Sequence, residues 1–434
     1  MSNIPSASYQ KMSACSFVNG EDRSYTKEQS PNREHENLLP IIAFCHLQWD
    51  WVWQRPQQFL SRLAKKRKVL FVETHRSDIV QSFAKIKEYE KTFQVTVMEI
   101  HLPKNRWDDG DYIDYERRRV LQEYLEMECM KCFSGAVLWF NDPMAATAYA
   151  GHMGESLIVY DCMDELTQFR GAPPQLAERE KNLTCQADLI FCGGRKMRDK
   201  RISINANTHF YGTGVDCNHF GTALLDDTPI DEEIAAMPRP VLGYFGVIDE
   251  RIDYELIEAL SDATPQGSVA MVGPFAKIDQ NELPRRKNLY WLGPRPYERL
   301  PAITKGLSVC LMPFALNAST EYINPTKALE YLAAGRPVVS TALDEVQMNC
   351  ADVVRIGRNK REFVEIALQE AVCPSSDRIA AGLSLAARNG WDVIADSLSD
   401  HIESALKSKK HNKQSSMKKV SLNKQVSIIE NIYV

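Results

Sequence analysis

The segment 324–339 combines residue types that can bind a phosphate group and a sugar diol. Pro325 can open a helix whose first amides lack partners, and Thr326 and Lys327 add a hydroxyl and a positive charge beside those amides. Glu330 follows within one turn and can accept hydrogen bonds from a vicinal diol such as ribose. A plain surface ion pair between Lys327 and Glu330 is the alternative, but it leaves the proline and the threonine unexplained. The segment therefore predicts a site for a ribose-linked anion.

Three further turns in the second half of the chain have the composition of ligand-binding turns. Each follows an expected strand: Gly246 and then Arg251 after 241–245, Gly273 after 268–272, and Pro294 with Arg295 after 289–292. Ligands of open α/β sheets bind outside the carboxyl ends of the strands. Glycine permits a close backbone approach, and arginine suits a diphosphate. Any one of these turns could instead serve strand-to-helix packing. The three turns together favour a binding site, whereas a single turn would not.

Aromatic and polar residues follow the strands expected in the first half. The strand 40–45 is followed by Trp49, Asp50, Trp51 and Arg55, the strand 135–140 by Asn141, and the strand 157–160 by Asp161 and Asp164. Indole rings can stack on sugar rings, and the polar groups can bind hydroxyls. The aromatic residues could equally pack in a core, and Asp164 could cap the next helix. We interpret this set as the binding surface for a second substrate.

Short apolar runs alternate with stretches of helical periodicity from Leu38 onward, which is typical of βα units and a mainly parallel sheet. The pattern restarts after an acidic, proline-bearing segment. We therefore expect a first domain over 38–225, a linker over 226–239 and a second domain over 240–385. A helix over 386–406 with one apolar stripe is expected to pack back toward the first domain.

Both ends of the chain differ from the rest in composition. Residues 1–37 are polar, without the pattern of a secretory signal, and are expected to form a disordered leader. Residues 407–434 are rich in lysine and are expected to form a flexible tail, either solvated or weakly attracted to anionic lipid. No apolar run approaches the ~20 residues needed to span a bilayer. We expect a cytoplasmic protein, and attraction of the tail to anionic lipid would place it at the inner face of the plasma membrane.

Composition argues against two other classes of protein. The 434 residues carry a formal net charge of -5, so no global positive field favours nucleic acid as a partner. The 11 cysteines are an odd and scattered set, unlike a disulfide scaffold. Cys129 and Cys132 form a single CxxC without the further ligands that tetrahedral zinc requires. We expect no bound metal.

Taken in order, these motifs resemble a known series. The second half is similar to the donor domain of retaining GT-B glycosyltransferases of glycosyltransferase family 4, through Phe245-Gly246, Val272-Gly273, 288–301, Pro313-Phe314, 325–339 and Trp391. The first half is similar to enzymes of bacterial polysaccharide and teichuronic-acid type, through 49–58, 140–143 and 160–165. The resemblance covers most of residues 38–406.

The resemblance implies an α/β architecture of GT-B type, in which two Rossmann-like parallel-sheet domains face a central cleft and a crossover helix ends the fold. It implies a nucleotide-sugar donor, with a UDP-sugar favoured, a saccharide or lipid-linked acceptor, retention of anomeric configuration, and no obligatory metal or other cofactor. Glu330 would bind the ribose, and Thr326 and Lys327 would flank the diphosphate. Arg251 falls near the family's phosphate lysine, and Asp161 would contact the donor sugar or the acceptor hydroxyl.

Two positions depart from the family pattern. Val247 stands where many members carry a phosphate-binding arginine, and Glu321 lies one residue away from the usual spacing to Glu330. These departures keep two other functions open: a non-catalytic nucleotide-sugar-binding scaffold and a nucleotide-sugar epimerase of the same fold.

Overall fold

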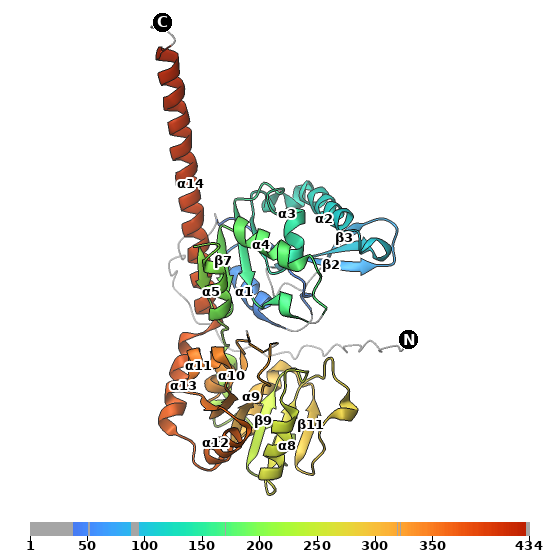
Figure 1. The fold of residues 1–434 in the computed structure, drawn as a ribbon, viewed down its shortest axis with the longest axis vertical. Coiled ribbons are helices and arrows are strands. Elements are labelled where there is room, and N and C mark those ends of the chain that lie inside the picture. Colours follow the sequence, from blue (N-terminus) through green and yellow to red (C-terminus); the bar gives the residue numbers. More distant parts are fainter. Residues whose placement is uncertain are drawn as a thin grey trace, which may run out of the picture.

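The chain folds into two lobes, each built on its own sheet (Figure 1). The computed structural model describes residues 38–50, 53–87, 95–169, 171–318, 320–321 and 323–430. The expected leader 1–37 and Trp51 lie outside the described residues. Helices flank both sheets, and the expected α/β class is confirmed.

The first lobe holds an eight-stranded sheet in the order β3-β4-β2-β1-β5-β6-β7-β8. Its strands are β1 Ile41–Phe44, β2 Val69–Ser77, β3 Phe83–Lys87, β4 Val95–Pro103, β5 Val137–Phe140, β6 Leu157–Cys162, β7 Leu189–Cys192 and β8 Thr208–Phe210. Its helices are α1 Arg55–Leu63, α2 Gly110–Leu125, α3 Ala146–Tyr149, α4 Leu176–Gln186 and α5 Arg195–Ile202. The strands pair in parallel except β3, which runs antiparallel to β4.

The second lobe holds a six-stranded parallel sheet in the order β11-β10-β9-β12-β13-β14. Its strands are β9 Val241–Phe245, β10 Ser268–Val272, β11 Leu289–Gly293, β12 Val309–Met312, β13 Val338–Thr341 and β14 Arg355–Gly357. Its helices are α6 Cys217–Gly221, α7 Glu232–Ala235, α8 Tyr254–Ala263, α9 Leu300–Gly306, α10 Lys327–Ala333, α11 Asp344–Cys350, α12 Lys360–Val372 and α13 Ser376–Arg388.

The strand order reverses at β1 in the first lobe and at β9 in the second. Loops on either side of such a switch point diverge and leave a crevice at the carboxyl ends of the strands. The turns singled out from the sequence after β1, β5, β9 and β10 therefore lie at the edges where ligands of α/β sheets bind.

The chain enters the core of the second lobe earlier than the expected linker. Val215 and Phe220 are buried in that core, and the Phe220 ring stacks on Phe245 at 5.9 Å. The segment 226–239 also packs on the second lobe, because Ile234 is fully buried in the same core. Asp231 binds Arg299 there as well, so the acidic composition of the segment reflects local ion pairing.

The last helix, α14 (Trp391–Glu430), returns to the first lobe, as expected of a crossover helix (Figure 1). The expected 386–406 helix is divided, since α13 ends at Arg388. Trp391 and Leu398 of α14 are buried among first-lobe residues, and the Trp391 ring lies 5.3 Å from that of Phe59. The helix continues to Glu430 through the segment expected to be flexible, and no glycine or proline follows Gly390 to stop it.

Within the described part of the chain, no helix has the length and apolar character needed to cross a bilayer.

We predict that Leu398→Ala lowers stability by about 2 to 5 kcal/mol, because the fully buried side chain would leave a cavity between α14 and the first lobe. Val393→Ala on the same helix is the matched control, since Val393 is 56% exposed, and it should change stability by less than about 0.5 kcal/mol. Urea unfolding followed by tryptophan fluorescence measures both. Equal effects would show that α14 is not docked as described.

Candidate functional site

The backbones of two loops touch at the carboxyl ends of β9 and β10. Gly246 and Gly273 both have φ of 150°, in the region that favours glycine. A Cβ on Gly273 would lie 1.7 Å from the Gly246 carbonyl oxygen, so no other residue fits without moving the backbone. Hydrogen bonds from Gly246 N to Val272 O and from Gly273 N to Gly293 O, each 2.9 Å, hold the loops in place. The two sequence-predicted glycines therefore form one crossing.

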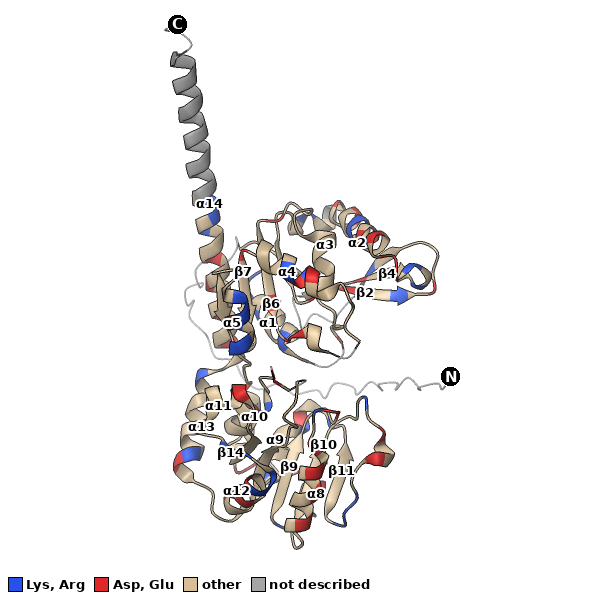
Figure 2. Cartoon of the chain, in the orientation of Figure 1, with Lys and Arg blue, Asp and Glu red and all other residues tan. Residues whose placement is uncertain are grey.

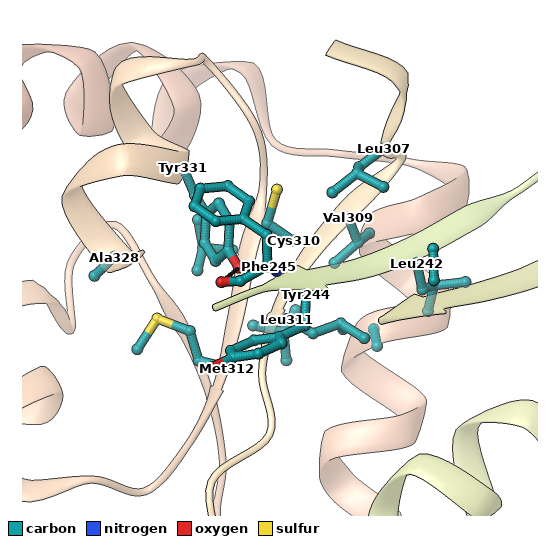
Figure 3. Packing of buried hydrophobic residues seen from close by; sticks show 14 of the residues in the cluster. Leu242, Tyr244, Phe245, Leu307, Val309, Cys310, Leu311, Met312, Ala328 and Tyr331 are labelled. Carbon is teal, nitrogen blue, oxygen red and sulfur yellow. Dashed lines mark hydrogen bonds between the residues drawn. The ribbon is translucent and has the colours of Figure 1, made fainter. Parts of the chain in front are cut away.

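Lys327 lies against this crossing. Its Cε would be 3.0 Å from a Cβ on Gly246, and its Nζ lies 5.3 Å from the centroid of the Phe245 ring. Tyr331 fixes α10 on β9, because its hydroxyl accepts a 3.0 Å hydrogen bond from Phe245 N (Figure 3). The lysine is thus positioned by packing on both sides. It presents a positive charge at the edge of the sheet.

Glu330 retains capacity to bind a further group. Its Oε2 lies 3.1 Å from Lys327 Nζ, so the ion pair considered from the sequence is present. That oxygen is buried and receives no well-directed hydrogen bond from the described residues. A buried carboxylate oxygen without a directed donor is costly, and a ligand hydroxyl would relieve that cost. The ion pair and a diol site are therefore compatible.

The helix carrying these residues is shorter than the sequence suggested. α10 has seven residues and begins at Lys327, so Pro325 precedes it and Thr326 is its N-cap, without a side-chain capping bond. A helix of this length contributes little dipole. The charge of Lys327 is the main feature that an anion would meet.

Arg251 lies on the loop after β9 and is held by Asp249. Its Nε and Nη2 donate to the Asp249 carboxylate, at 2.9 Å and 2.7 Å. Burial tends to lower the pKa of Arg251, but the hydrogen bonds to Asp249 and the nearby charge of Asp164 raise it overall. The guanidinium is therefore a fixed positive charge whose side chain is still 36% exposed.

Asp164 faces this arginine from the other lobe. Burial raises the pKa of Asp164 to about 6, while the positive charges of Arg251 and Arg55 oppose that shift. Asp164 follows β6 of the first lobe, whereas Arg251 follows β9 of the second. The mutual effect of the two groups shows that the lobes face each other at their carboxyl ends.

Two exposed residues that the sequence did not single out have shifted pKa values. Tyr297 is 38% exposed, yet desolvation followed by the negative charge of Glu330 raises its pKa strongly. His46 is exposed, yet desolvation lowers its pKa against the opposing effect of Asp142. Both side chains are therefore in contact with solvent and also partly desolvated by the protein around them. The position of His46 just after β1 could have marked it in the sequence. No feature of the sequence marked Tyr297.

Three predicted contact residues form a buried network instead of an open surface. Asp161 is fully buried, and its carboxylate lies 2.8 Å from Arg55 Nη2 and 3.0 Å from Asn141 Nδ2. Arg55 also donates to the carbonyl of Tyr211 at 2.6 Å. We therefore revise the expected catalytic contact of Asp161: it braces the loops after β1, β5 and β8.

The remaining expected contacts are dispersed. Trp49 is 3% exposed and packs against Phe71, so it is a core residue. Asp50 is exposed and binds Lys87 at 3.3 Å. Arg295, next to Pro294, binds Glu233 of α7, so its guanidinium is engaged within the second lobe.

The lobes also touch directly through α5. Lys196 binds Glu321 at 3.2 Å and also pairs with Asp344. Asn324 donates a 2.8 Å hydrogen bond to the carbonyl of Gly193. Figure 2 shows that α5, which is rich in lysine and arginine, lies beside the second lobe. The displaced carboxylate Glu321 thus binds the opposite lobe.

One group among the described residues has the composition of a metal site. Ligand atoms of Glu73, His75 and Glu99 lie within 4.8 Å of one another. The ammonium of Lys87, however, lies 2.7 Å from Glu99 and 3.4 Å from Glu73. A lysine already neutralises these carboxylates, so the group does not fit a cation as it stands.

Two α/β lobes facing across a crevice, with a helix that crosses back, define the GT-B fold of glycosyltransferases. The fold is similar to that of sucrose-phosphate synthase from Thermosynechococcus elongatus, with a TM-score of 0.61, 13% identity, and coverage of 85% of this chain and 100% of that one. It is also similar to the E. coli trehalose-6-phosphate structure bound with UDP-2-fluoro glucose, with a TM-score of 0.61, 14% identity, and coverage of 85% and 99%. At these identities the likeness concerns the fold.

A relative by sequence is TuaH of Bacillus subtilis strain 168, a glycosyltransferase provisionally assigned to teichuronic acid biosynthesis. It is 24% identical over 314 residues, which cover 67% of this chain and 76% of TuaH. No protein-family model matches the chain. The chain is a glycosyltransferase of GT-B fold, as the motifs predicted, and its placement in family 4 stays a prediction.

We predict that Gly273→Ala abolishes nucleotide binding and lowers the melting temperature, because its methyl group would overlap the Gly246 carbonyl. Gly221→Ala is the control, since nothing lies within 4 Å of its Cβ position, and it should leave both properties nearly unchanged. Calorimetric titration with UDP and thermal unfolding measure the pair. Normal UDP affinity in Gly273→Ala would contradict the described crossing.

Asp164→Asn should raise stability relative to the native chain, increasingly so as the pH rises from about 4 to about 7. The raised pKa means that the folded state holds a proton that the unfolded state has released in this range. Native stability from this group is therefore present below pH 4 and lost as the pH passes 6. Denaturant unfolding at several pH values tests this, and a stability difference independent of pH would refute it.

Proposed function

We propose that the chain transfers a sugar from a nucleotide-sugar donor, a UDP-sugar, to a saccharide or lipid-linked saccharide acceptor in cell-surface polysaccharide biosynthesis. One observation carries the proposal: Lys327 packs against Gly246 of the Gly246–Gly273 crossing and pairs with Glu330, on the side that Asp164 faces from the other lobe. The UDP-sugar analogue of the E. coli structure and the assignment of TuaH support the substrate classes.

In this proposal the second lobe holds the donor. Glu330 accepts hydrogen bonds from the ribose diol through the oxygen that lacks a directed partner. Lys327 and Arg251 meet the diphosphate, on which negative charge grows as the sugar departs. Asp249 occupies Nε and Nη2 of Arg251, which leaves Nη1 for a phosphate oxygen. Preorganised charges of this kind stabilise the transition state without moving during the reaction.

The chemistry proposed is front-face transfer with retention. The bond from the anomeric carbon to the diphosphate oxygen breaks, and a bond to the acceptor oxygen forms on the same face. The acceptor proton passes to the departing phosphate oxygen, so no protein base is required. Asp164, whose pKa of about 6 allows both protonation states near neutral pH, orients the acceptor hydroxyl.

The fixed positive charges of Lys327 and Arg251 beside the diphosphate would take the place of a divalent metal. We therefore propose turnover without a metal. We also propose that the protein works at the inner face of the plasma membrane. The exposed Lys407, Lys409 and Lys410 begin a lysine-rich segment that anionic lipid would attract. A lipid-linked acceptor would be reached there.

We predict that Lys327→Ala slows release of UDP in the presence of acceptor by about 100-fold or more, because one preorganised charge contact is lost. Lys360→Ala removes a lysine that pairs with Glu255 on the surface of the second lobe, and it should stay within about 2-fold of the native rate. A panel of UDP-, GDP- and dTDP-sugars, with and without EDTA, identifies the donor and the metal requirement.

The outcomes separate the alternatives. Equal rates in the two lysine variants would overturn the site. Saturable donor binding without transfer to any acceptor would favour the non-catalytic scaffold, and conversion of the donor without an acceptor would favour an epimerase. Inversion at the anomeric carbon of the product would reject the front-face step.

A further inference from the structure

A groove of about 370 Å³ lies between α14 and the first lobe, far along the sheet from the crevice. It opens at the amino ends of the strands, since Asp188 precedes β7 and Asn207 precedes β8. The crevice, by contrast, lies at the carboxyl ends. The volume falls within the range of small-molecule sites.

Two imidazoles, His209 and His401, lie side by side in this groove, with ring centroids 4.2 Å apart. One comes from β8 and the other from α14. Among the described residues, none makes a hydrogen bond or an ion pair with either ring. Two adjacent imidazoles that lack hydrogen-bond acceptors repel each other when both are protonated. Burial, and then the charge of His401, accordingly lower the pKa of His209.

The charges around the groove favour an anion. Lys409 lines it and lies 2.7 Å from Asp188, which is the one carboxylate of the lining. That carboxylate oxygen also accepts a 2.8 Å hydrogen bond from Ile158 N, so Asp188 is already engaged. The side chains of Ser404 and Asn207 add neutral donors. Lys409, His209 and His401 can thus each carry a positive charge in the groove, and the Asp188 carboxylate already has its hydrogen-bond partners.

We propose that this groove binds a phosphate group, carried either by a free phosphorylated compound or by a lipid headgroup. The phosphate oxygens accept hydrogen bonds from Lys409 and from the two protonated imidazoles, and the serine and asparagine complete the shell. Because the contacts come from both α14 and the strand starts, the bound ligand stabilises the docking of α14 on the first lobe. The site is separate from the donor crevice.

Each protonated imidazole should strengthen binding, because the anion favours the charged form of the ring. The other ionisable groups facing the pair are Asp188, Lys409, Tyr211 and, beyond the tyrosine, Asp400. None of these has its ordinary pKa between 6 and 8. Inorganic phosphate also gains negative charge as the pH rises through this range, so the difference in pH dependence between the native chain and His401→Gln reports the imidazole.

The experiment compares Lys409→Gln with Lys410→Gln in the full chain. Both remove one exposed lysine from α14, but only Lys409 lines the groove. Calorimetric titration with inorganic phosphate at constant ionic strength tests the free ligand. Flotation with phosphatidylglycerol vesicles, against phosphatidylcholine vesicles, tests the headgroup. Circular dichroism and UDP binding confirm that each variant is folded.

We expect Lys409→Gln to weaken binding by about 10-fold or more in the arm where the native chain binds. Lys410→Gln should weaken phosphate binding by less than about 2-fold, and should weaken vesicle binding less than Lys409→Gln does. His401→Gln should also weaken binding, and more so at pH 6 than at pH 8, because the lost imidazole is charged mainly at the lower pH. Saturation by phosphate identifies the free ligand, and binding to the anionic vesicles alone identifies the headgroup. Equal effects of the two lysine variants, or no binding in either arm, would overturn the proposal.

Discussion

The arrangement of the candidate site depends on one steric constraint, the contact between the backbones of Gly246 and Gly273. A Cβ on Gly273 would lie 1.7 Å from the Gly246 carbonyl oxygen, so the loops after β9 and β10 can approach this closely only because residue 273 is glycine. Lys327 packs against Gly246 and extends over the Phe245 ring. The charge of the lysine and the carboxylate of Glu330 then lie where the strand order reverses, which is where an α/β sheet opens toward solvent.

The second determinant is electrostatic and spans the two lobes. Asp249 holds the guanidinium of Arg251 in place, and the charge of Arg251 limits how far burial raises the pKa of Asp164. The contacts of Lys196 with Glu321 and Asp344 hold the lobes together beside the crevice. The lobes are therefore linked by charged groups as well as by α14, and such links can be broken and reformed more readily than an apolar interface.

Local features were readable from the sequence. The glycine turns, Lys327 and Glu330 were found because strand ends, turn residues and helix starts are encoded by neighbouring residues. The fold class followed from the alternation of apolar runs with helical periodicity. The end of α14 could not be placed in the same way, since the lysine-rich composition suggested a flexible segment while the absence of glycine and proline permits a helix.

Partners distant in the chain could not be predicted. Asp161 was expected to contact a ligand, but it is paired with Arg55 across 106 positions of sequence, and only the folded sheet brings them together. Trp49 was left open between core and surface because one aromatic residue in a loop carries no periodicity. Early entry of Phe220 into the second lobe was likewise hidden, since its partner Phe245 lies beyond the acidic segment.

A crystal structure of the full chain with UDP is the most direct test of the central claim. We predict the diphosphate beside Lys327 and Arg251, the ribose hydroxyls on Glu330, and the uracil toward Tyr297. UDP bound at any other place, or a crevice closed by side chains around Lys327 with UDP excluded, would contradict the account.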